Sequence, residues 1–392
     1  MSARFIRGRV MFSSAVIQSF TEKETPFYYY DLSLLRETLS VVQDLAKQYD
    51  YDIHYAVKAN SNQKILQEIR DFGLGIDCVS GNEIRRCIES GFKGEQVLFA
   101  GVGKTDKEIE YAIQQNIQFF NCESIEEIGV INEIAGKMNR QVGIAIRINP
   151  NVDAKTHRYI TTGTTENKFG IEQKYLPEII QQVHCWPYVN LIGIHFHIGS
   201  QITDLSVFES LCTRVNEIQD WLEQQSIKIK HLNLGGGLGI DYQSPDTVKI
   251  ADFQRYFEIF NRLIKRREGQ KIHFELGRSI VGQCGSLISR VLYVKKGITT
   301  NFVILDAGMT ELMRPALYQS YHQIDNLSSQ RENSQPYDVV GPICESSDCF
   351  GRGIRLPETQ RGDLIAIRSA GAYGEVMQSS YNLRTQNSSL YT

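Results

Sequence analysis

The sequence lacks a long apolar run and an excess of charge of either sign. No hydrophobic segment approaches the roughly 20 residues that a helix needs to span a bilayer. The chain has 42 Lys and Arg residues against 45 Asp and Glu residues, a formal net charge of -3. This balance gives no reason to expect nucleic acid or an anionic membrane as partner. The composition is that of an ordinary globular protein, and a length of 392 residues favours two domains.

The cysteines show neither close pairing nor the pattern of a zinc site. They are scattered along the chain, at Cys78, Cys87, Cys122, Cys185, Cys212, Cys284, Cys344 and Cys349. Such scatter indicates reduced thiols in a cytoplasmic compartment, and we expect no metal site. The first twenty residues hold Arg4, Arg7 and Arg9 and no acid, which weakly resembles an organelle transit segment. We favour a first strand or an added extension instead, because the stretch is short, and it has no apolar core for a secretory signal.

Strand-like runs alternate with helical stretches between residues 51 and 276. Eight short runs are predicted strands, at residues 53–58, 74–79, 96–100, 117–121, 142–148, 191–198, 229–234 and 271–276. Segments with helical periodicity, such as 62–72, 82–90 and 253–267, lie between them. This alternation predicts a (β/α)8 TIM-type barrel, which is an α/β fold. The alternative, a doubly wound open sheet, would usually carry a dominant phosphate loop near its start, and this sequence has none.

The pattern changes after Gly282, where helical periodicity becomes scarce. Residues 287–294, 302–305 and 363–368 are predicted strands, and turn-forming residues cluster between them, as at 326–335. We therefore predict a barrel over residues 30–281 and a second, C-terminal β-rich domain over residues 282–392, which also takes in residues 1–29.

Function in such a barrel belongs to side chains at the carboxyl ends of the strands. Lys58 ends the first predicted strand, where a buried amine is costly unless it is paired or covalently used. Taken alone, a lysine whose ammonium reaches solvent is the commoner explanation. His195 and His197 end a later strand and share one of its faces by alternation. Either histidine alone is more often a hydrogen-bonded core residue than a catalytic one.

Glycine-rich turns end the last two predicted strands. Gly235-Gly236-Gly237 follows the seventh, and Glu275-Leu276-Gly277-Arg278 follows the eighth. Glycine allows backbone amides to approach a phosphate closely. A lysine, a histidine, such a turn and a carboxylate at one rim are the groups that a pyridoxal phosphate site needs, since the carboxylate keeps the pyridine nitrogen protonated. The combination predicts pyridoxal 5'-phosphate as the cofactor.

These residues belong to longer motifs, namely Tyr55-Ala56-Val57-Lys58-Ala59-Asn60, His197-Ile198-Gly199-Ser200-Gln201, Gly235-Gly236-Gly237, Glu275-Leu276-Gly277-Arg278 and Cys344-Glu345-Ser346. The set resembles the alanine-racemase-fold, pyridoxal-phosphate-dependent decarboxylases that act on basic amino acids. Further segments are most similar to the branch acting on diaminopimelate: Asp306-Ala307-Gly308-Met309, Arg314-Pro315-Ala316-Leu317-Tyr318, Gly371-Ala372-Tyr373-Gly374 and Tyr381-Asn382. The resemblance covers nearly the whole chain. Two departures, Leu276 where proline is usual and Asn82 where glycine is usual, bear only on backbone shape.

The resemblance implies how the cofactor is held. Lys58 would carry it, His197 would stack on its ring, and Glu275 would pair with the pyridine nitrogen. Amides and a hydroxyl would hold the phosphate, supplied by Ser200, Gly236, Gly237, Gly277 and Arg278. Tyr373 would close the cofactor pocket.

The resemblance also implies a substrate and a proton donor. The substrate would be bound by Arg278, Arg314, Tyr318, Glu345 and Tyr373. Arginine suits a distal carboxylate and glutamate suits a distal ammonium, which together favour meso-2,6-diaminopimelate. Cys344 would donate the proton after carbon dioxide leaves, and its segment would come from the other subunit of an obligate homodimer. The product would be L-lysine, made in the last step of lysine biosynthesis.

Three alternatives remain open at this stage. Decarboxylation of carboxynorspermidine or another diamine acid would not need both Arg278 and Arg314. A racemase of the same fold would place an arginine at the position of Glu275. An inactive regulatory homologue would be expected to lack Lys58 or Cys344, and both are present.

Overall fold

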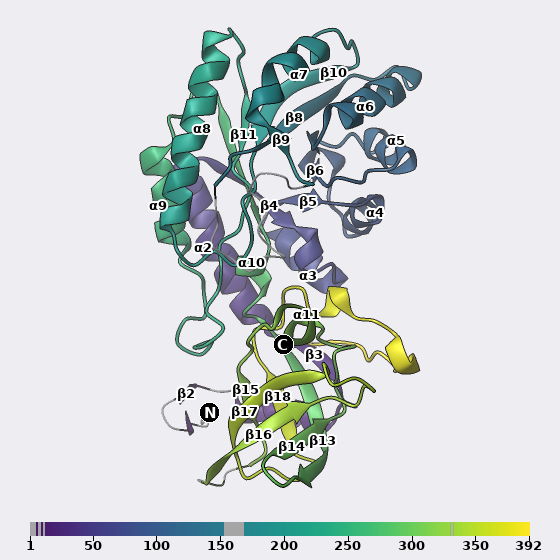
Figure 1. Cartoon of the computed structure of the whole chain (residues 1–392), viewed down its shortest axis with the longest axis vertical. Helices are drawn as coiled ribbons and strands as arrows, with labels where there is room; N and C mark the ends of the chain where they lie inside the picture. The colour runs from purple at the N-terminus through teal and green to yellow at the C-terminus, as the bar shows by residue number, and fades with distance from the viewer. Residues whose placement is uncertain (1–4, 7–8, 11, 153–167, 330, 332) are drawn as a thin grey trace. The chain divides into compact units, whose positions relative to one another are not determined.

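The computed structural model of the chain describes residues 5–6, 9–10, 12–152, 168–329, 331 and 333–392 (Figure 1). The chain divides into two compact units. The barrel unit comprises Thr38–Gly239 and Asp252–Arg278, and the β-rich unit comprises Met1–Glu37, Ile240–Ala251 and Ser279–Thr392. The ranges expected from the sequence were 30–281 for the barrel and 1–29 with 282–392 for the other domain. The structure assigns residues 240–251 to the β-rich unit as well.

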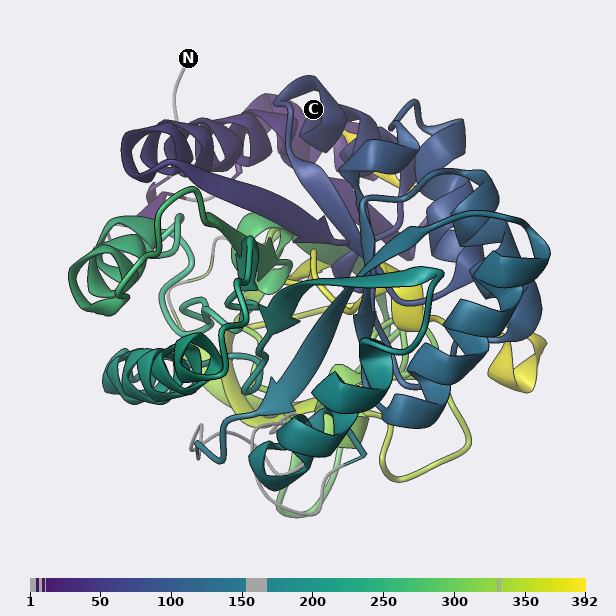
Figure 2. The same ribbon diagram turned by 90° about the horizontal axis from the view of Figure 1, so that it is seen from above.

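A closed ring of eight parallel strands forms the barrel, and Figure 2 shows the helices arranged around it. In order around the ring the strands are β4 (Tyr51–Ala56), β5 (Gly75–Cys78), β6 (Val97–Phe99), β7 (Phe119–Cys122), β8 (Val142–Asn149), β10 (Val189–His195), β11 (His231–Asn233) and β12 (Lys271–Leu276). The last strand pairs with the first, with Phe274 opposite Ile53, and this closes the ring. The predicted TIM-type α/β barrel is confirmed, and the short β9 (Ile171–Glu172) pairs with β8 in addition.

Helices cover the outside of the ring. They are α2 (Leu32–Tyr49), α3 (Gln63–Asp71), α4 (Gly81–Glu89), α5 (Asp106–Gln114), α6 (Ile125–Lys137), α7 (Leu176–Val183), α8 (Ser206–Gln224) and α9 (Phe253–Leu263), with the short α10 (Arg278–Val281) after β12. Ser80, Thr105 and Ser124 accept a backbone N–H in the first turn of α4, α5 and α6, which fixes where each helix begins. On α9, Phe257 and Phe260 pack against Phe274 of β12. Aromatic burial thus attaches this helix to the ring.

The barrel interior is half apolar and half polar. Leu98, Phe119 and Ala145 form a small apolar cluster, while β4, β12 and β11 contribute three histidines. The Nδ1 atom of His273 lies 3.0 Å from Nε2 of His54, and its Nε2 atom lies 2.9 Å from Nδ1 of His231. Burial lowers the pKa of all three imidazoles, that of His54 to about 4. The three rings therefore form a neutral hydrogen-bonded chain inside the barrel.

The β-rich unit is built around one long strand, β13 (Gly285–Lys296). Its partners and their neighbours are β3 (Phe27–Tyr30), β14 (Asn301–Leu305), β15 (Ile324–Asn326), β16 (Ser334–Val340), β17 (Cys349–Pro357), β18 (Leu364–Ile367) and β19 (Leu390–Tyr391). Phe20 of α1 (Ser14–Thr21), Phe27 and Ile288 belong to its buried core. The short strands β1 (Phe5–Ile6) and β2 (Arg9–Val10) pair with each other, and α11 (Arg314–Tyr318) follows β14.

The β-rich character expected after Gly282 is confirmed, with β13, β14 and β18 close to the three predicted strands. The sequence did not predict β15, β16 and β17, because their turn-rich composition masked the alternation. Among the residues that the structure describes, no helix is both long enough and apolar enough to cross a membrane.

Candidate active site

Lys58 and Asp77 form an ion pair at the carboxyl end of the first two barrel strands. Lys58 lies in a 3-10 turn, Val57–Ala59, directly after β4, and Asp77 lies on β5. The lysine Nζ atom is 2.9 Å from Oδ2 of Asp77, whose side chain is fully buried and whose Oδ1 has no hydrogen-bond partner. Burial and the nearby Glu275 raise the pKa of Asp77 to about 6, although Lys58 opposes the shift. The pair therefore joins an amine to a carboxylate that can take up a proton near neutral pH.

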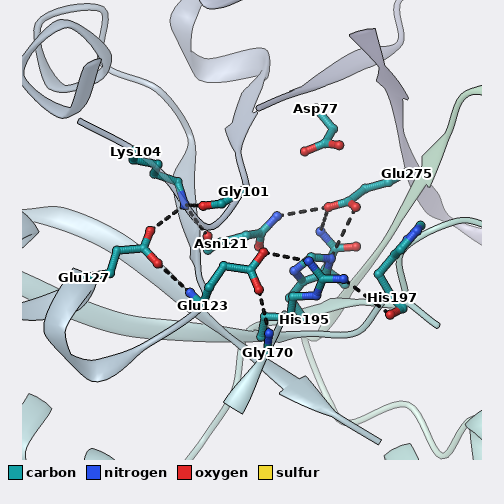
Figure 3. A network of polar contacts seen from close by, with 12 residues as sticks. Asp77, Gly101, Lys104, Asn121, Glu123, Glu127, Gly170, His195, His197 and Glu275 are labelled. Carbon is teal, nitrogen blue, oxygen red and sulfur yellow. Dashed lines mark hydrogen bonds and ion pairs between the residues drawn. The ribbon is translucent and has the colours of Figure 1, made fainter. Parts of the chain in front are cut away.

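Glu275 of β12 receives hydrogen bonds from the neighbouring strand β11 and from β7 across the barrel (Figure 3). Its Oε1 atom accepts from Nδ2 of Asn121 at 3.0 Å and from Nδ2 of Asn233 at 2.7 Å. Its Oε2 atom lies 3.3 Å from Nε2 of His195. Burial opposes ionisation of Glu275, but His195 and then Lys58 outweigh it, so that the pKa of this carboxyl lies below its ordinary value. Glu275 is a buried carboxylate that stays charged.

His197, two residues beyond His195, is held as a neutral ring. Its Nδ1 atom accepts the N–H of Gly236 at 3.3 Å. Burial lowers its pKa well below the ordinary value, and the nearby charges of Arg147 and Lys58 lower it further. Arg147 also approaches the carbonyl oxygen of His197 at 3.5 Å and pairs with Glu123 at 2.6 Å. A neutral, oriented imidazole offers a flat face on which an aromatic ring can stack.

The turn Gly235-Gly236-Gly237 after β11 accepts no residue with a side chain. Gly235 has φ +67° and Gly237 has φ +107°, in the left-handed region that favours glycine. A Cβ on Gly236 would collide with the carbonyl oxygen of Glu275. Backbone therefore packs directly on backbone at this turn, as a cradle for a phosphate requires.

Ser200 and Arg278, two of the residues predicted to bind the phosphate, contact each other. The Oγ atom of Ser200 accepts from Nη2 of Arg278 at 3.0 Å. Gly277, just before Arg278, is closely packed, since a Cβ there would lie 3.0 Å from Cβ of Ala59. The hydroxyl and the guanidinium supply the polar groups that an anion binds.

Together these barrel residues fit pyridoxal phosphate. The amine of Lys58 suits the aldehyde carbon, the ionised Glu275 suits a protonated pyridine nitrogen, and the turn around Gly236 suits the phosphate. The orphaned Oδ1 of Asp77 is the kind of buried polar atom that a bound group satisfies.

The remaining predicted residues all belong to the β-rich unit. Arg314 begins α11, is buried, and donates from Nη2 to Ser320 Oγ at 3.2 Å. The side chains of Tyr318 and Tyr373 are half-buried, and those of Cys344 and Glu345 are exposed. Tyr373 has φ +56°, an unusual value for a residue with a side chain.

Sequence reasoning missed several polar residues of the barrel interior, namely Asp77, Asn121, Asn233 and Arg147. The charged Asp77 and Arg147 lie in predicted strands that are otherwise apolar, and such a residue is itself a signal, whereas the neutral amides of Asn121 and Asn233 give none. His195 was recognised as sharing a face with His197, but its proximity to Glu275 depends on the pairing of β10, β11 and β12.

Comparison with known proteins identifies the family. Residues 33–282 match the pyridoxal-dependent decarboxylase, pyridoxal binding domain family. A diaminopimelate decarboxylase from Bacteroides thetaiotaomicron is 55% identical over 369 residues, which cover 94% of this chain and 95% of the relative. The diaminopimelate decarboxylase of Neisseria meningitidis serogroup A is 42% identical over 362 residues, 92% of this chain and 88% of its own. The chain belongs to the diaminopimelate decarboxylase family.

Solved structures of this family have the same fold. The crystal structure of the Helicobacter pylori diaminopimelate decarboxylase complexed with L-lysine matches with a TM-score of 0.90 and 40% identity, over 96% of this chain and 94% of that one. The crystal structure of the diaminopimelate decarboxylase from M. jannaschii in co-complex with L-lysine matches with a TM-score of 0.89 and 33% identity, over 98% of this chain and 91% of that one. As a member of the diaminopimelate decarboxylase family the chain is a carboxy-lyase that depends on pyridoxal phosphate, which confirms the predicted enzyme class and cofactor.

Proposed function

We propose that the protein decarboxylates the D-configured centre of meso-2,6-diaminopimelate, giving L-lysine and carbon dioxide in the last step of lysine biosynthesis. The observation that carries the proposal is the ionised Glu275, buried 2.7 Å from Asn233 at the rim that holds Lys58. A carboxylate at this position suits a decarboxylase, whereas a racemase of the same fold would place an arginine here. When bound, the cofactor supplies an electron sink for the bond that breaks at the substrate carbon.

The barrel residues hold the cofactor and its protons in this proposal. Lys58 is the covalent anchor, and Asp77, 2.9 Å away, takes the proton that the ammonium must lose before the amine can react. Glu275 keeps a proton on the ring nitrogen, and His197 supports the face of the ring. The phosphate is bound by a set of amides, a hydroxyl and a guanidinium from Ser200, Gly236, Gly237, Gly277 and Arg278.

Substrate choice is assigned to the buried Arg314 together with Arg278, Tyr318, Glu345 and Tyr373. A guanidinium is the natural bidentate partner of a distal carboxylate, so ornithine and lysine, which lack that carboxylate, would bind without the ion pair to Arg314. Cys344 donates the proton that replaces the lost carboxylate. Its exposed side chain supports a homodimer in which the Cys344 segment of a second copy completes the site. The scatter of eight free cysteines supports a cytoplasmic location.

The test begins with the absorbance of lysine-bound pyridoxal phosphate in the purified protein. We expect the band to vanish in Lys58→Ala and to persist in Lys64→Ala, a more exposed lysine on α3. Carbon dioxide release is then measured from meso-diaminopimelate, ornithine, arginine and carboxynorspermidine, and we expect release from the first alone. Release from another substrate would refute the assignment of Arg314, and a protein that binds no cofactor would refute the proposed function. Sedimentation of the holoenzyme checks the dimer.

A further inference from the structure

We infer that Asn121 and Asn233 are positioning residues that hold Glu275 in its charged form toward the ring nitrogen of the cofactor. The inference rests on the proposed function and adds two side chains to the machinery that sets ring protonation. Both amides donate to the same oxygen, Oε1 of Glu275: Asn233 from β11, the strand that pairs with β12, and Asn121 from β7, which lies across the barrel (Figure 3). The other oxygen, Oε2, is left to His195 and to the cofactor.

The orientation of Asn233 follows from its second hydrogen bond. Its Oδ1 atom accepts the N–H of Gly235 at 2.9 Å, so that only its NH2 group can face Glu275. The same side chain therefore links the carboxylate assigned to the ring nitrogen with the first glycine of the turn assigned to the phosphate. A backbone hydrogen bond joins the same two segments, since the N–H of Glu275 donates to the carbonyl oxygen of Gly235 at 2.8 Å. Asn233 thus sets the spacing between the two ends of the cofactor site.

The backbone of Asn121 is fixed by the buried ion pair between Lys104 and Glu127. The Nζ atom of Lys104 donates to the carbonyl oxygens of Asn121 and Gly101, each at 2.8 Å, and to the carboxylate of Glu127. The Lys104 side chain has 0% exposure, and all three ammonium hydrogens have an acceptor. A buried lysine with every hydrogen used fixes the backbone that carries the Asn121 side chain (Figure 3).

The Asn121 side chain serves Glu275 alone. Its Nδ2 atom donates to Glu275, while its Oδ1 atom is buried and has no hydrogen-bond partner among the residues that the structure describes. An unsatisfied buried carbonyl costs stability, so a leucine of similar volume would suit this position better if packing were all that mattered. The amide is explained by the charge that it faces, because a donor that cannot give up its proton stabilises a carboxylate over a carboxylic acid.

The charged and titratable groups around Glu275 include Lys58, Asp77, His195 and His197, and its charge also acts on His54, His273 and Tyr256. Asp77 is itself an acid, and its charge works against a second carboxylate in the same interior. The two neutral amides therefore supply donors to Glu275 without adding another titrating group.

The test compares cofactor binding by apo proteins that carry Asn121→Asp, Asn121→Leu or Asn216→Asp. The first replaces the donor by a carboxylate beside Glu275, so that the two acids must share a proton, and the second removes the donor with little change of volume. Asn216 of α8 is the matched control, because its amide is likewise used in hydrogen bonds within the barrel unit, donating to Leu263 O at 2.8 Å and accepting from Lys265 N at 2.9 Å, without contacting Glu275.

We expect the dissociation constant for pyridoxal phosphate to rise by about tenfold in Asn121→Asp, the factor that corresponds to one pKa unit. Asn121→Leu is expected to weaken binding too, without lowering the melting temperature of the apo protein, and both variants should alter the absorbance spectrum of the bound cofactor. Asn216→Asp should match the wild type in affinity and spectrum. Wild-type affinity and spectrum in both Asn121 variants, or an equal loss in Asn216→Asp, would overturn this inference alone. A wild-type protein without affinity for the cofactor would overturn the proposed function with it.

Discussion

The Oδ1 atom of Asn382 accepts the backbone N–H of Cys344 at 3.3 Å. Asn382 and Leu383 both have left-handed backbone conformations, with φ +55° and +54°, which are costly for residues with side chains. On the other side of the same segment, the buried Asp348 accepts the N–H of Ile343 at 2.7 Å. The segment that carries Cys344 is therefore held from two sides by elements of the β-rich unit.

Asn382→Gly is expected to lower kcat for meso-diaminopimelate about fivefold, since glycine keeps the left-handed conformation but loses a hydrogen bond worth ~1 kcal/mol. Asn382→Ala should lower kcat further, because alanine also disfavours that conformation. Steady-state kinetics and the rate of Cys344 alkylation, located by mass spectrometry, measure both effects. Wild-type kcat and wild-type Cys344 reactivity in the glycine variant would show that the contact does not position the proton donor.

The Lys58–Asp77 pair predicts a pH dependence of cofactor uptake. The pKa of Asp77 is raised to about 6, so Asp77 can accept the lysine proton above that pH and loses this capacity as the pH falls below it. We expect the rate at which apo protein forms the lysine-bound band to drop below about pH 6. Asp77→Asn should be slow at every pH, whereas Asp71→Asn, an exposed aspartate on α3, should follow the wild type. If the rate of band formation in Asp77→Asn has the same pH profile as in the wild type, Asp77 does not accept the lysine proton.

The chain of His54, His273 and His231 predicts loss of stability in mild acid. Their folded-state pKa values are lowered, so below the ordinary value of about 6.5 the unfolded chain binds protons that the folded chain does not. The free energy of unfolding should therefore be highest above pH 6.5 and fall as the pH decreases, by at most about 1.4 kcal/mol per pH unit for each of the two most buried rings, His54 and His273. Urea denaturation of the protein at several pH values, followed by a spectroscopic signal from the barrel, measures the slope of the free energy of unfolding against pH.

A variant isolates the contribution of one ring to that slope. His54→Gln should reduce the slope by about one proton, because the pKa of His54 is lowered to about 4. His184→Gln, at an exposed position after α7, should leave the slope unchanged. Equal slopes in wild type and His54→Gln would place the acid sensitivity elsewhere.

Gly236→Ala is expected to abolish cofactor binding, since a methyl group there would collide with the carbonyl oxygen of Glu275. The strain should also destabilise the barrel by at least about 2 kcal/mol, because backbone atoms cannot move aside as a flexible side chain can. Gly103→Ala is the control, as a Cβ at Gly103 has nothing within 4 Å. The measurements are the absorbance of the bound cofactor and the thermal unfolding of both variants. A cofactor band in Gly236→Ala would show that the turn can accommodate a methyl group at this position.

The fold could be predicted where the pattern is local. Each barrel strand is a short apolar run between turns, and all eight were found within a few residues of their ends. By contrast, the pairing of β16 with β14 joins segments about thirty residues apart, and the turn between β16 and its next strand β17 obscures the alternation of both. The assignment of residues 240–251 to the β-rich unit likewise depends on long-range contacts that no local pattern carries.

The residues of the candidate site could be predicted where burying a charged or polar side chain costs free energy. Lys58, His197 and Glu275 were predicted because a charged or polar group buried at the end of a strand is costly unless it has a partner or a function. Asn121 and Asn233 were not found, because a neutral amide in a strand is unremarkable until ring closure places it beside Glu275. A single strand gives the face on which a residue lies, but the partner across the barrel comes only from the order of the strands.

The β-rich unit joins distant parts of the chain in a way that bears on its synthesis. Strand β3, at Phe27–Tyr30, pairs with β13 and also with β19, at Leu390–Tyr391. A nascent chain leaving the ribosome therefore carries β3 without its partners while the whole barrel is being made. The barrel can fold as soon as β12 has emerged, whereas one edge of the aromatic strand β3 waits for β13 and the other waits until Leu390–Tyr391 has been made.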